Sequence, residues 1–261
     1  MDRPLEPDTA QWRSLAGTVV DHLAGVLDAL PDSPVSDWSL SQQVLADPAL
    51  RRPPPEQGRP LPELLDLVAR AARPGINASS PGHMAYIPGS GLVTAALADL
   101  IIDVLNRYTG LTMPAPGLVA LETDLVRWLA DQVGLPDTAG GTLTSGGSIA
   151  MLSALVTARH ARLPENFLDG TLYVTEQVHR SATKAARLAG FPASAVRVVA
   201  TDTALRMDTA ALAAAVAADR DAGRTPFCVV ASAGTTNTGV IDPLPEIAAF
   251  CADAGLWLHV D

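Results

Sequence analysis

Several residue types are scarce in this chain of 261 residues. Only one of its 18 basic residues is a lysine, Lys184, and the formal net charge is −10. This acidic balance argues against a surface for nucleic acid or for an anionic membrane. No apolar run approaches the length of a membrane span, and the first residues lack the basic and apolar regions of a secretory signal. We therefore expect no nucleic-acid partner, no membrane and a cytoplasmic location.

Cysteine and histidine are also few. Cys228 and Cys251 lie in apolar surroundings without metal-ligand spacing, which favours buried free thiols over a disulfide. The five histidines are scattered, and none forms a His-x-x-x-His pair or a cluster with cysteine. We therefore predict no metal site.

The pattern of expected elements changes near Gly140. Before it, apolar residues repeat at helical spacing, and we expect helices near 8–30, 62–72, 92–106 and 118–133. After it, strand-like segments near 143, 171–174, 196–199, 227–231 and 256–260 alternate with helices near 149–162, 181–189, 208–222 and 244–254. This alternation predicts an α/β fold with a mainly parallel sheet covered by helices.

Residues 140–150 read Gly-Gly-Thr-Leu-Thr-Ser-Gly-Gly-Ser-Ile-Ala, which predicts a strand, a tight turn and a helix. Glycines let a ligand approach the backbone, Ser148 can cap the helix, and the first helical N–H groups attract an anion. A phosphate group would suit this turn. The alternative, a turn that needs glycine for its geometry alone, stays open.

Polar residues follow three of the expected strands, where doubly wound sheets bind ligands. His179 follows 171–174, Thr235 and Thr236 follow 227–231, and Asp261 ends the last strand. With the glycine turn, they would offer a phosphate site, an imidazole, hydroxyls and a carboxylate. Pyridoxal phosphate suits this set, because its ring stacks on an aromatic face and its pyridine nitrogen needs an acidic partner.

Each of these residues also has an ordinary interpretation. His179 could be a capping or surface histidine, and Thr235 and Thr236 could be turn residues. Asp261 ends an apolar strand, where an unpaired carboxylate would be costly, so a functional role is favoured. His259 shares a strand face with Asp261, and we expect a structural or supporting role for it.

Four motifs resemble, in order and spacing, those of the group II pyridoxal-phosphate-dependent amino acid decarboxylases. They are Ser145-Gly146-Gly147-Ser148, the segment 177–190, Ala233-Gly234-Thr235-Thr236 and Trp257-Leu258-His259-Val260-Asp261. Segments 85–89 and 106–110 also resemble bacterial members. We expect the two loops at 83–89, with His83 and Tyr86, and at 107–116 to contribute to the substrate pocket. The resemblance covers roughly residues 75–261. It implies a large domain like that of fold type I pyridoxal-phosphate-dependent transferases, with helices on both faces of the sheet.

The resemblance also implies roles for individual residues. Gly147 and Ser148 would hold the phosphate of pyridoxal 5'-phosphate, and His179 would stack on its ring. Thr236 would lie beside the ring oxygen, and Asp261 would pair with the pyridine nitrogen. His179 and Thr236 are the expected catalytic residues. The expected reaction is decarboxylation of an L-amino acid, with aromatic amino acids favoured, in a homodimer.

The chain departs from the family in one important way. The family binds its cofactor covalently through a lysine beyond the final Val-Asp, and no residue of this chain can be given that role. Lys184 lies in a different motif, so we expect a surface or helix-end role for it. Ile149 and Met151 also stand where an acidic and a small polar residue are common. We therefore expect an N-terminal portion of a decarboxylase, inactive alone, completed by a longer chain or a second polypeptide.

We expect an N-terminal helical dimerisation segment at 1–90 and a truncated cofactor-binding large domain at 91–261. An alternative hypothesis is a non-catalytic dimerisation or regulatory fragment, because the N-terminal helices resemble a helical flap that packs against the partner subunit in the family. A further variant is aldehyde formation from the same substrates. Nucleotide binding is disfavoured, because the glycine turn fits neither a Walker A motif nor a full dinucleotide fingerprint.

Overall fold

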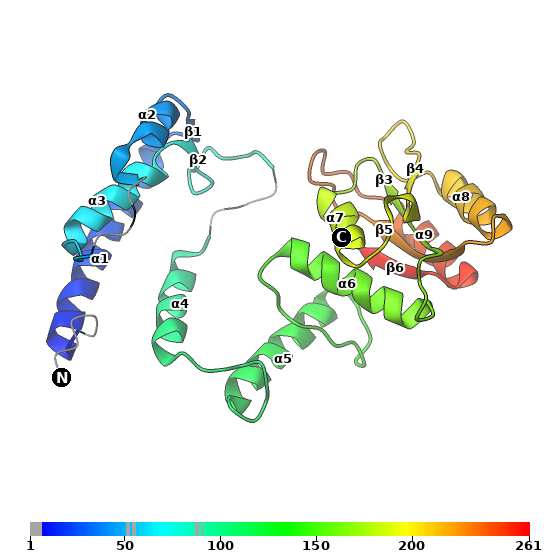
Figure 1. Ribbon diagram of the computed structural model, residues 1–261, viewed down its shortest axis with the longest axis horizontal. Coiled ribbons are helices and arrows are strands. Elements are labelled where there is room, and N and C mark those ends of the chain that lie inside the picture. Colours follow the sequence, from blue (N-terminus) through cyan, green and yellow to red (C-terminus); the bar gives the residue numbers. More distant parts are fainter. Residues whose placement is uncertain (1–6, 51–52, 54–55, 87–88, 90) are drawn as a thin grey trace. The chain divides into compact units, whose positions relative to one another are not determined.

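The structure is a computed structural model that describes residues 7–50, 53, 56–86, 89 and 91–261. The chain divides into two compact units, Met1–Leu105 and Asn106–Asp261, whose elements are labelled in Figure 1. The domain boundary expected after Ser90 stays a prediction. Ser90 itself, and Ile87 and Pro88 of the expected pocket loop, lie outside the described residues.

The N-terminal unit is mainly helical. Its elements are α1 (Thr9–Ala29), η1 (Leu30–Asp32), β1 (Ser36–Asp37), α2 (Ser41–Ala46), η2 (Pro48–Leu50), α3 (Leu61–Ala72), β2 (Gly75–Ile76) and α4 (Val93–Leu105). Strands β1 and β2 pair antiparallel, and α1 packs against α3. None of the residues in α1, α3 and α4 is buried, so many large apolar side chains of these helices face solvent.

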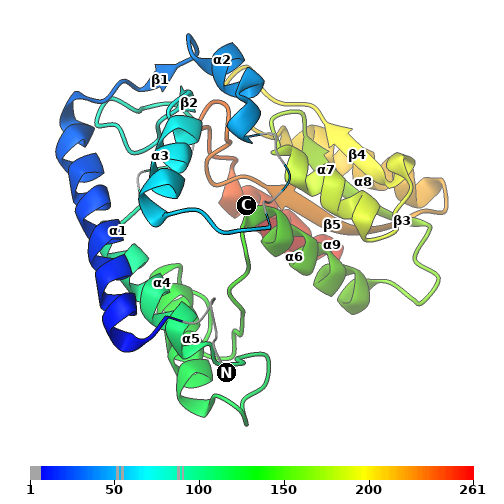
Figure 2. The ribbon, with the colours of Figure 1, turned by 60° about the vertical axis from the view of Figure 1, so that its left-hand side comes forward.

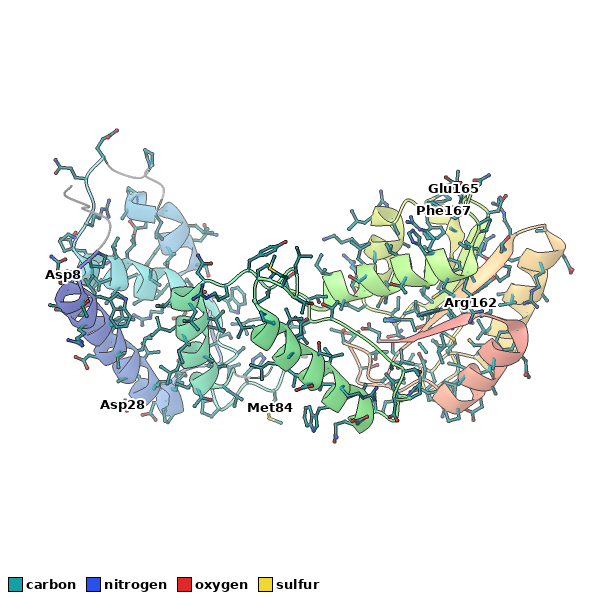
Figure 3. All side chains as sticks on the ribbon, turned by 90° about the horizontal axis from the view of Figure 1, so that it is seen from below. Asp8, Asp28, Met84, Arg162, Glu165 and Phe167 are labelled. Atoms are coloured by element: carbon teal, nitrogen blue, oxygen red, sulfur yellow. The ribbon has the colours of Figure 1, made fainter. Side chains whose placement is uncertain are left out.

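Helix α1 begins where the sequence predicts. Asp8 is its N-cap, and the Asp8 carboxylate accepts the Gln11 N–H over 2.8 Å while the Gln11 side chain accepts the Asp8 N–H over 2.9 Å. This reciprocal capping box satisfies two N–H groups that the helix cannot bond internally. Figure 3 labels Asp8 and Asp28 near the two ends of α1.

The second unit is an α/β fold, as the alternation of elements predicts. Its elements are α5 (Pro116–Gln132), α6 (Gly147–Arg162), β3 (Gly170–Thr175), α7 (Arg180–Leu188), η3 (Ala193–Ala195), β4 (Val196–Val199), α8 (Thr209–Asp221), β5 (Thr225–Ala231), α9 (Leu244–Ala254) and β6 (Trp257–Val260). The four strands lie in the order β4-β3-β5-β6, and every neighbouring pair is parallel. The predicted parallel sheet is confirmed.

Alternating residues of the central strands point to two separate cores. In β3, Leu172 and Val174 pack in a cluster with α6 and α7, whereas Tyr173 packs in a cluster with α8 and α9. Because successive strand residues face opposite sides of a sheet, these clusters lie on its two faces. Helices therefore cover both faces, with α6 and α7 on one side and α8 and α9 on the other (Figures 1 and 2).

The connection from α6 to β3 belongs to the first of these cores. The Phe167 ring lies edge-on to the Phe191 ring, with centroids 5.1 Å apart, and the Arg159 guanidinium lies 4.4 Å from the Phe167 centroid. Figure 3 shows Phe167 and Glu165 on this connection. The connection therefore fixes the C-terminal end of α6 against the sheet.

One predicted strand is wrong. Residues 139–144 form no strand, although β-favouring residues surround Leu143. The Leu143 N–H donates to Glu122 Oε1 of α5 over 2.9 Å, and the Thr142 hydroxyl lies 3.2 Å from the same oxygen. A carboxylate on a helix therefore takes the hydrogen bonds that a neighbouring strand would take.

Among the residues that the structure describes, no helix is both long and apolar enough to cross a membrane.

Candidate functional site

The glycine turn leads directly into α6. Gly146 is the N-cap, with φ 152° and ψ 169°, a conformation that is essentially restricted to glycine. Its carbonyl accepts the N–H groups of Ile149 and Ala150 over 3.0 and 3.1 Å. Ser148 is therefore the second helical residue and not the cap, so the predicted capping role of Ser148 is wrong. Ser148 is exposed, which leaves its hydroxyl accessible.

The start of α6 has the features of an anion site. A Cβ built on Gly147 would meet no atom within 4 Å, so the space beside this residue is open. Within the described part of the chain, the N–H groups of Gly147 and Ser148 meet no acceptor. Two free N–H groups, an exposed hydroxyl and the positive end of the helix dipole fit a phosphate group.

His179 begins α7, immediately after β3. It is the N-cap of α7, and its Nδ1 accepts the Ser181 N–H over 3.3 Å and lies 2.9 Å from Ser181 Oγ. The ring is exposed, whereas Ser181 is buried. The capping interpretation of His179 is therefore correct, and capping leaves the ring accessible to a ligand.

Ser148 and His179 line the same groove, which has a volume of about 780 Å³. Helices α6 and α7 pack side by side, which brings the two helix starts together. The basic residues Arg180, Lys184 and Arg187 of α7 also line the groove. Their charges favour an anionic ligand in an otherwise acidic chain. Lys184, the only lysine of the chain, is exposed on the surface of α7, as the sequence predicts.

Asp261 is held against the loop that follows β5. Its N–H donates to the Ala231 carbonyl over 2.8 Å, and its carbonyl accepts the Ala233 N–H over 2.7 Å. Thr236 lies on the same loop and is partly buried, whereas the Thr235 hydroxyl lies 2.7 Å from the Thr238 hydroxyl within the turn. Thr235 therefore stabilises its own turn, and Thr236 is the more accessible of the pair.

Three of the predicted site residues follow neighbouring strands of the sheet. Strands β3, β5 and β6 are parallel neighbours, so their carboxyl ends lie together, and these strands are followed by His179, Thr236 and Asp261 in turn. Figures 1 and 2 both show the end of β6 next to the start of α6. The topology therefore places an imidazole, a hydroxyl and a carboxylate after the carboxyl ends of adjacent strands, and the imidazole shares a groove with Ser148 at the start of α6.

His259 lies on β6, two residues before Asp261. Burial lowers the pKa of His259, and the nearby Asp261 carboxylate opposes this shift. His259 is partly buried, and this burial penalises the charged form of its imidazole. This agrees with the structural or supporting role predicted for His259.

The sequence does not identify Asp242, a residue that stabilises the loop after β5. Its side chain is buried, and Oδ2 accepts the Ser232 N–H over 2.8 Å while Oδ1 accepts the Met207 N–H over 2.7 Å. The only local signal is an acidic residue between Ile241 and Pro243, which does not identify these partners.

The two expected pocket loops have different positions in the chain. His83 and Tyr86 belong to the N-terminal unit, and their part in a pocket stays a prediction. Arg107 belongs to the second unit and lines a groove of about 380 Å³ with Pro114 and Leu121, against α5. Nothing in this groove identifies a ligand.

Known proteins are similar to this chain in sequence and in fold. The sequence profile described as "Pyridoxal-dependent decarboxylase conserved domain" matches residues 48–261. An aromatic-L-amino-acid decarboxylase of Bacillus atrophaeus is 32% identical over 262 residues, which cover 100% of this chain and 54% of that protein.

Solved structures are similar to the fold of this chain. A crystal structure of Oryza sativa TDC with PLP and tryptamine superposes with a TM-score of 0.89 at 28% identity, over 100% of this chain and 56% of that one. The Rhodiola rosea 4-hydroxyphenylacetaldehyde synthase superposes with a TM-score of 0.88 at 26% identity, over 99% of this chain and 57% of that one. The chain thus spans about half the length of the curated relatives it matches.

Proposed function

The chain belongs to the family of pyridoxal-dependent decarboxylases, and from this we propose that it forms the cofactor-binding part of an enzyme that decarboxylates an L-amino acid. The observation that carries the proposal is the position of His179, Thr236 and Asp261 after three adjacent parallel strands, beside the start of α6. Bound pyridoxal phosphate supplies an electron-withdrawing ring that accepts the electron pair released when CO2 leaves the α-carbon.

Each residue then has a distinct task. Gly147 and Ser148 bind the phosphate through their N–H groups and the serine hydroxyl, a role supported by the open space beside Gly147. His179 stacks its exposed ring on the cofactor ring. Thr236 donates a hydrogen bond to the ring oxygen, and Asp261 keeps a proton on the pyridine nitrogen. These tasks make His179 and Thr236 the catalytic residues.

Aromatic amino acids are the favoured substrates. The support is the similarity to an aromatic-L-amino-acid decarboxylase over the whole of this chain. The similarity to an aldehyde synthase keeps aldehyde formation as a second possible outcome for the same substrates. Product analysis separates the two, because decarboxylation yields an amine and the other reaction yields an aldehyde.

The proposed partner is a second copy of the chain or a polypeptide that supplies what the relatives carry beyond this half. Exposed apolar side chains on α1 and α4, such as Trp12, Leu97 and Ile101, support a protein partner on those helices. The free buried thiols of Cys228 and Cys251 suit the reducing cytoplasm, which we propose as the location.

The test combines cofactor binding with turnover. Pyridoxal phosphate is titrated into the chain, and binding is followed by absorbance and by quenching of tryptophan fluorescence. Carboxyl-labelled amino acids are then incubated with the complete enzyme, and released CO2 is counted. Cofactor binding that is lost in Ser148→Ala and Asp261→Asn supports the proposal. Absence of binding, together with absence of CO2 from every amino acid, overturns it.

The second candidate is a non-catalytic dimerisation or regulatory fragment. The exposed apolar side chains of α1 and α4 favour it, because they offer a surface that needs no cofactor. Gel filtration with light scattering distinguishes the candidates. A stable dimer that binds no pyridoxal phosphate supports the second candidate, whereas cofactor binding supports the first.

A further inference from the structure

His179 and Ser181 share two contacts at the start of α7. The Ser181 N–H donates to His179 Nδ1 over 3.3 Å, and Ser181 Oγ lies 2.9 Å from the same nitrogen. Ser181 is 6% exposed, whereas the His179 ring is exposed at the groove. A buried residue therefore holds one edge of an accessible ring.

The first contact decides which ring nitrogen carries the proton. A backbone N–H can only donate, so Nδ1 must offer its lone pair to Ser181. A hydrogen on Nδ1 would face the hydrogen of the Ser181 N–H. A neutral ring that accepts at Nδ1 carries its proton on Nε2. The Ser181 hydroxyl then acts as the second donor to Nδ1, because that nitrogen has no hydrogen to give.

We propose that Ser181 is a positioning residue that fixes the tautomer and the plane of the His179 ring. Its hydroxyl and N–H hold Nδ1 as an acceptor and thereby place the ring hydrogen on Nε2. The His179 ring therefore presents a flat face to the groove, together with a hydrogen-bond donor at Nε2.

The importance of this arrangement for catalysis rests on the proposed function. A ring that stacks on pyridoxal phosphate must keep one orientation, and two contacts to a buried residue resist its rotation. The donor at Nε2 can also meet a carboxylate oxygen of an amino acid bound in the groove. A ring with the opposite tautomer would present an acceptor there and repel that oxygen.

The test measures the tautomer directly and needs no cofactor. The chain is labelled with 15N in the histidine rings, and the ring nitrogens are observed by NMR above the titration range of histidine. His179→Gln identifies the signals of His179. We expect a non-protonated Nδ1 and a protonated Nε2. In Ser181→Ala the ratio of the two tautomers should move toward Nδ1–H by about fivefold, as for the loss of one hydrogen bond.

Two further variants test whether the effect comes from the Ser181 hydroxyl. Ser181→Thr keeps a hydroxyl at the same position and should restore the wild-type spectrum. Thr183→Ala removes a hydroxyl from the same helix turn, where it donates to the Arg180 carbonyl over 3.1 Å, and should leave the His179 signals unchanged. A protonated Nδ1 in the wild type, or a Ser181→Ala spectrum identical to that of the wild type, overturns the inference.

Titration of the same proteins with pyridoxal phosphate separates this inference from the proposed function. We expect binding to weaken about fivefold in Ser181→Ala and to recover in Ser181→Thr. The predicted tautomer without any cofactor binding would refute the proposed function alone. Cofactor binding to a chain whose His179 samples both tautomers equally would refute this inference alone.

Discussion

Ser232 and Asp242 are joined by two hydrogen bonds of opposite direction. The Ser232 N–H donates to Asp242 Oδ2 over 2.8 Å, and the Asp242 N–H donates to the Ser232 carbonyl over 2.9 Å. Asp242 Oδ1 also accepts the Met207 N–H over 2.7 Å. The buried carboxylate therefore closes the loop that carries Thr236 and fastens it to a neighbouring connection.

Replacement of this carboxylate should destabilise the fold. In Asp242→Asn, one oxygen becomes an NH2 group that faces a backbone N–H, so a buried donor is left without an acceptor. We expect the free energy of unfolding to fall by about 1–3 kcal/mol, measured by urea denaturation. Asp253→Asn makes the same change at an exposed position of α9, and it should alter the free energy of unfolding by less than about 0.5 kcal/mol. Equal effects of the two variants would contradict this account.

The two glycines before and within α6 should respond differently to alanine. Gly146 has φ 152°, where a side chain is strained, so Gly146→Ala should lower the free energy of unfolding by about 1–3 kcal/mol. Gly147 is helical and has open space beside it, so Gly147→Ala should retain stability or raise it by up to about 1 kcal/mol. The added methyl group would occupy the proposed phosphate position, and pyridoxal phosphate should bind more weakly. Thermal denaturation and cofactor titration measure these effects, and normal cofactor binding by Gly147→Ala would argue against a phosphate at α6.

Local patterns were sufficient to predict the sheet and the residues at its edge. The apolar runs of β3 and β5 are long and bounded by turn residues, and both strands are buried on two faces. His179 and Thr236 could be selected because each follows such a run, and Asp261 because it ends the strand-like segment at 256–260. Their roles stay predictions.

Features that depend on distant partners could not be predicted. Leu143 has a strand-like sequence, but its hydrogen bond goes to Glu122, 21 residues earlier, so no strand forms. Asp242 reaches Met207, 35 residues away, and no local pattern marks that pair. The contact of Ser181 with His179 is local, yet a serine two residues after a histidine has no distinctive signature.

The buried hydroxyl of Tyr173 should also stabilise the fold. It donates to Asp219 Oδ2 over 2.7 Å, and Asp219 also accepts from the Arg197 guanidinium over 2.6 Å. Burial raises the pKa of Tyr173, so the phenol keeps its proton. Tyr173→Phe removes one donor and leaves the Thr171 hydroxyl, 3.1 Å away, without this partner. We expect a loss of about 1–3 kcal/mol in the free energy of unfolding.

Tyr108→Phe is the matched control for this variant. Tyr108 is 66% exposed, so removal of its hydroxyl should change the free energy of unfolding by less than about 0.5 kcal/mol. Chemical denaturation of both variants in the same buffer gives the comparison. A loss in Tyr108→Phe as large as that in Tyr173→Phe would show that the buried network does not account for the effect.

His259 should make the stability of the chain depend on pH. Burial lowers its pKa in the folded state below the ordinary value of 6.5, while Asp261 opposes the shift. Below about pH 6.5 the unfolded state therefore binds more protons at His259 than the folded state does. The contribution of neutral His259 to the stability of the folded chain is complete above that pH and is lost as the pH falls. We expect the free energy of unfolding to decrease between about pH 7 and about pH 5, by at most about 1.4 kcal/mol per pH unit, and more steeply than in His259→Gln. Asp261→Asn should lower the pKa of His259 further, which an NMR titration of its ring measures. A His259 pKa at or above 6.5 in the folded chain would contradict the burial argument, because only a penalty on the charged imidazole moves the value downward against a neighbouring carboxylate.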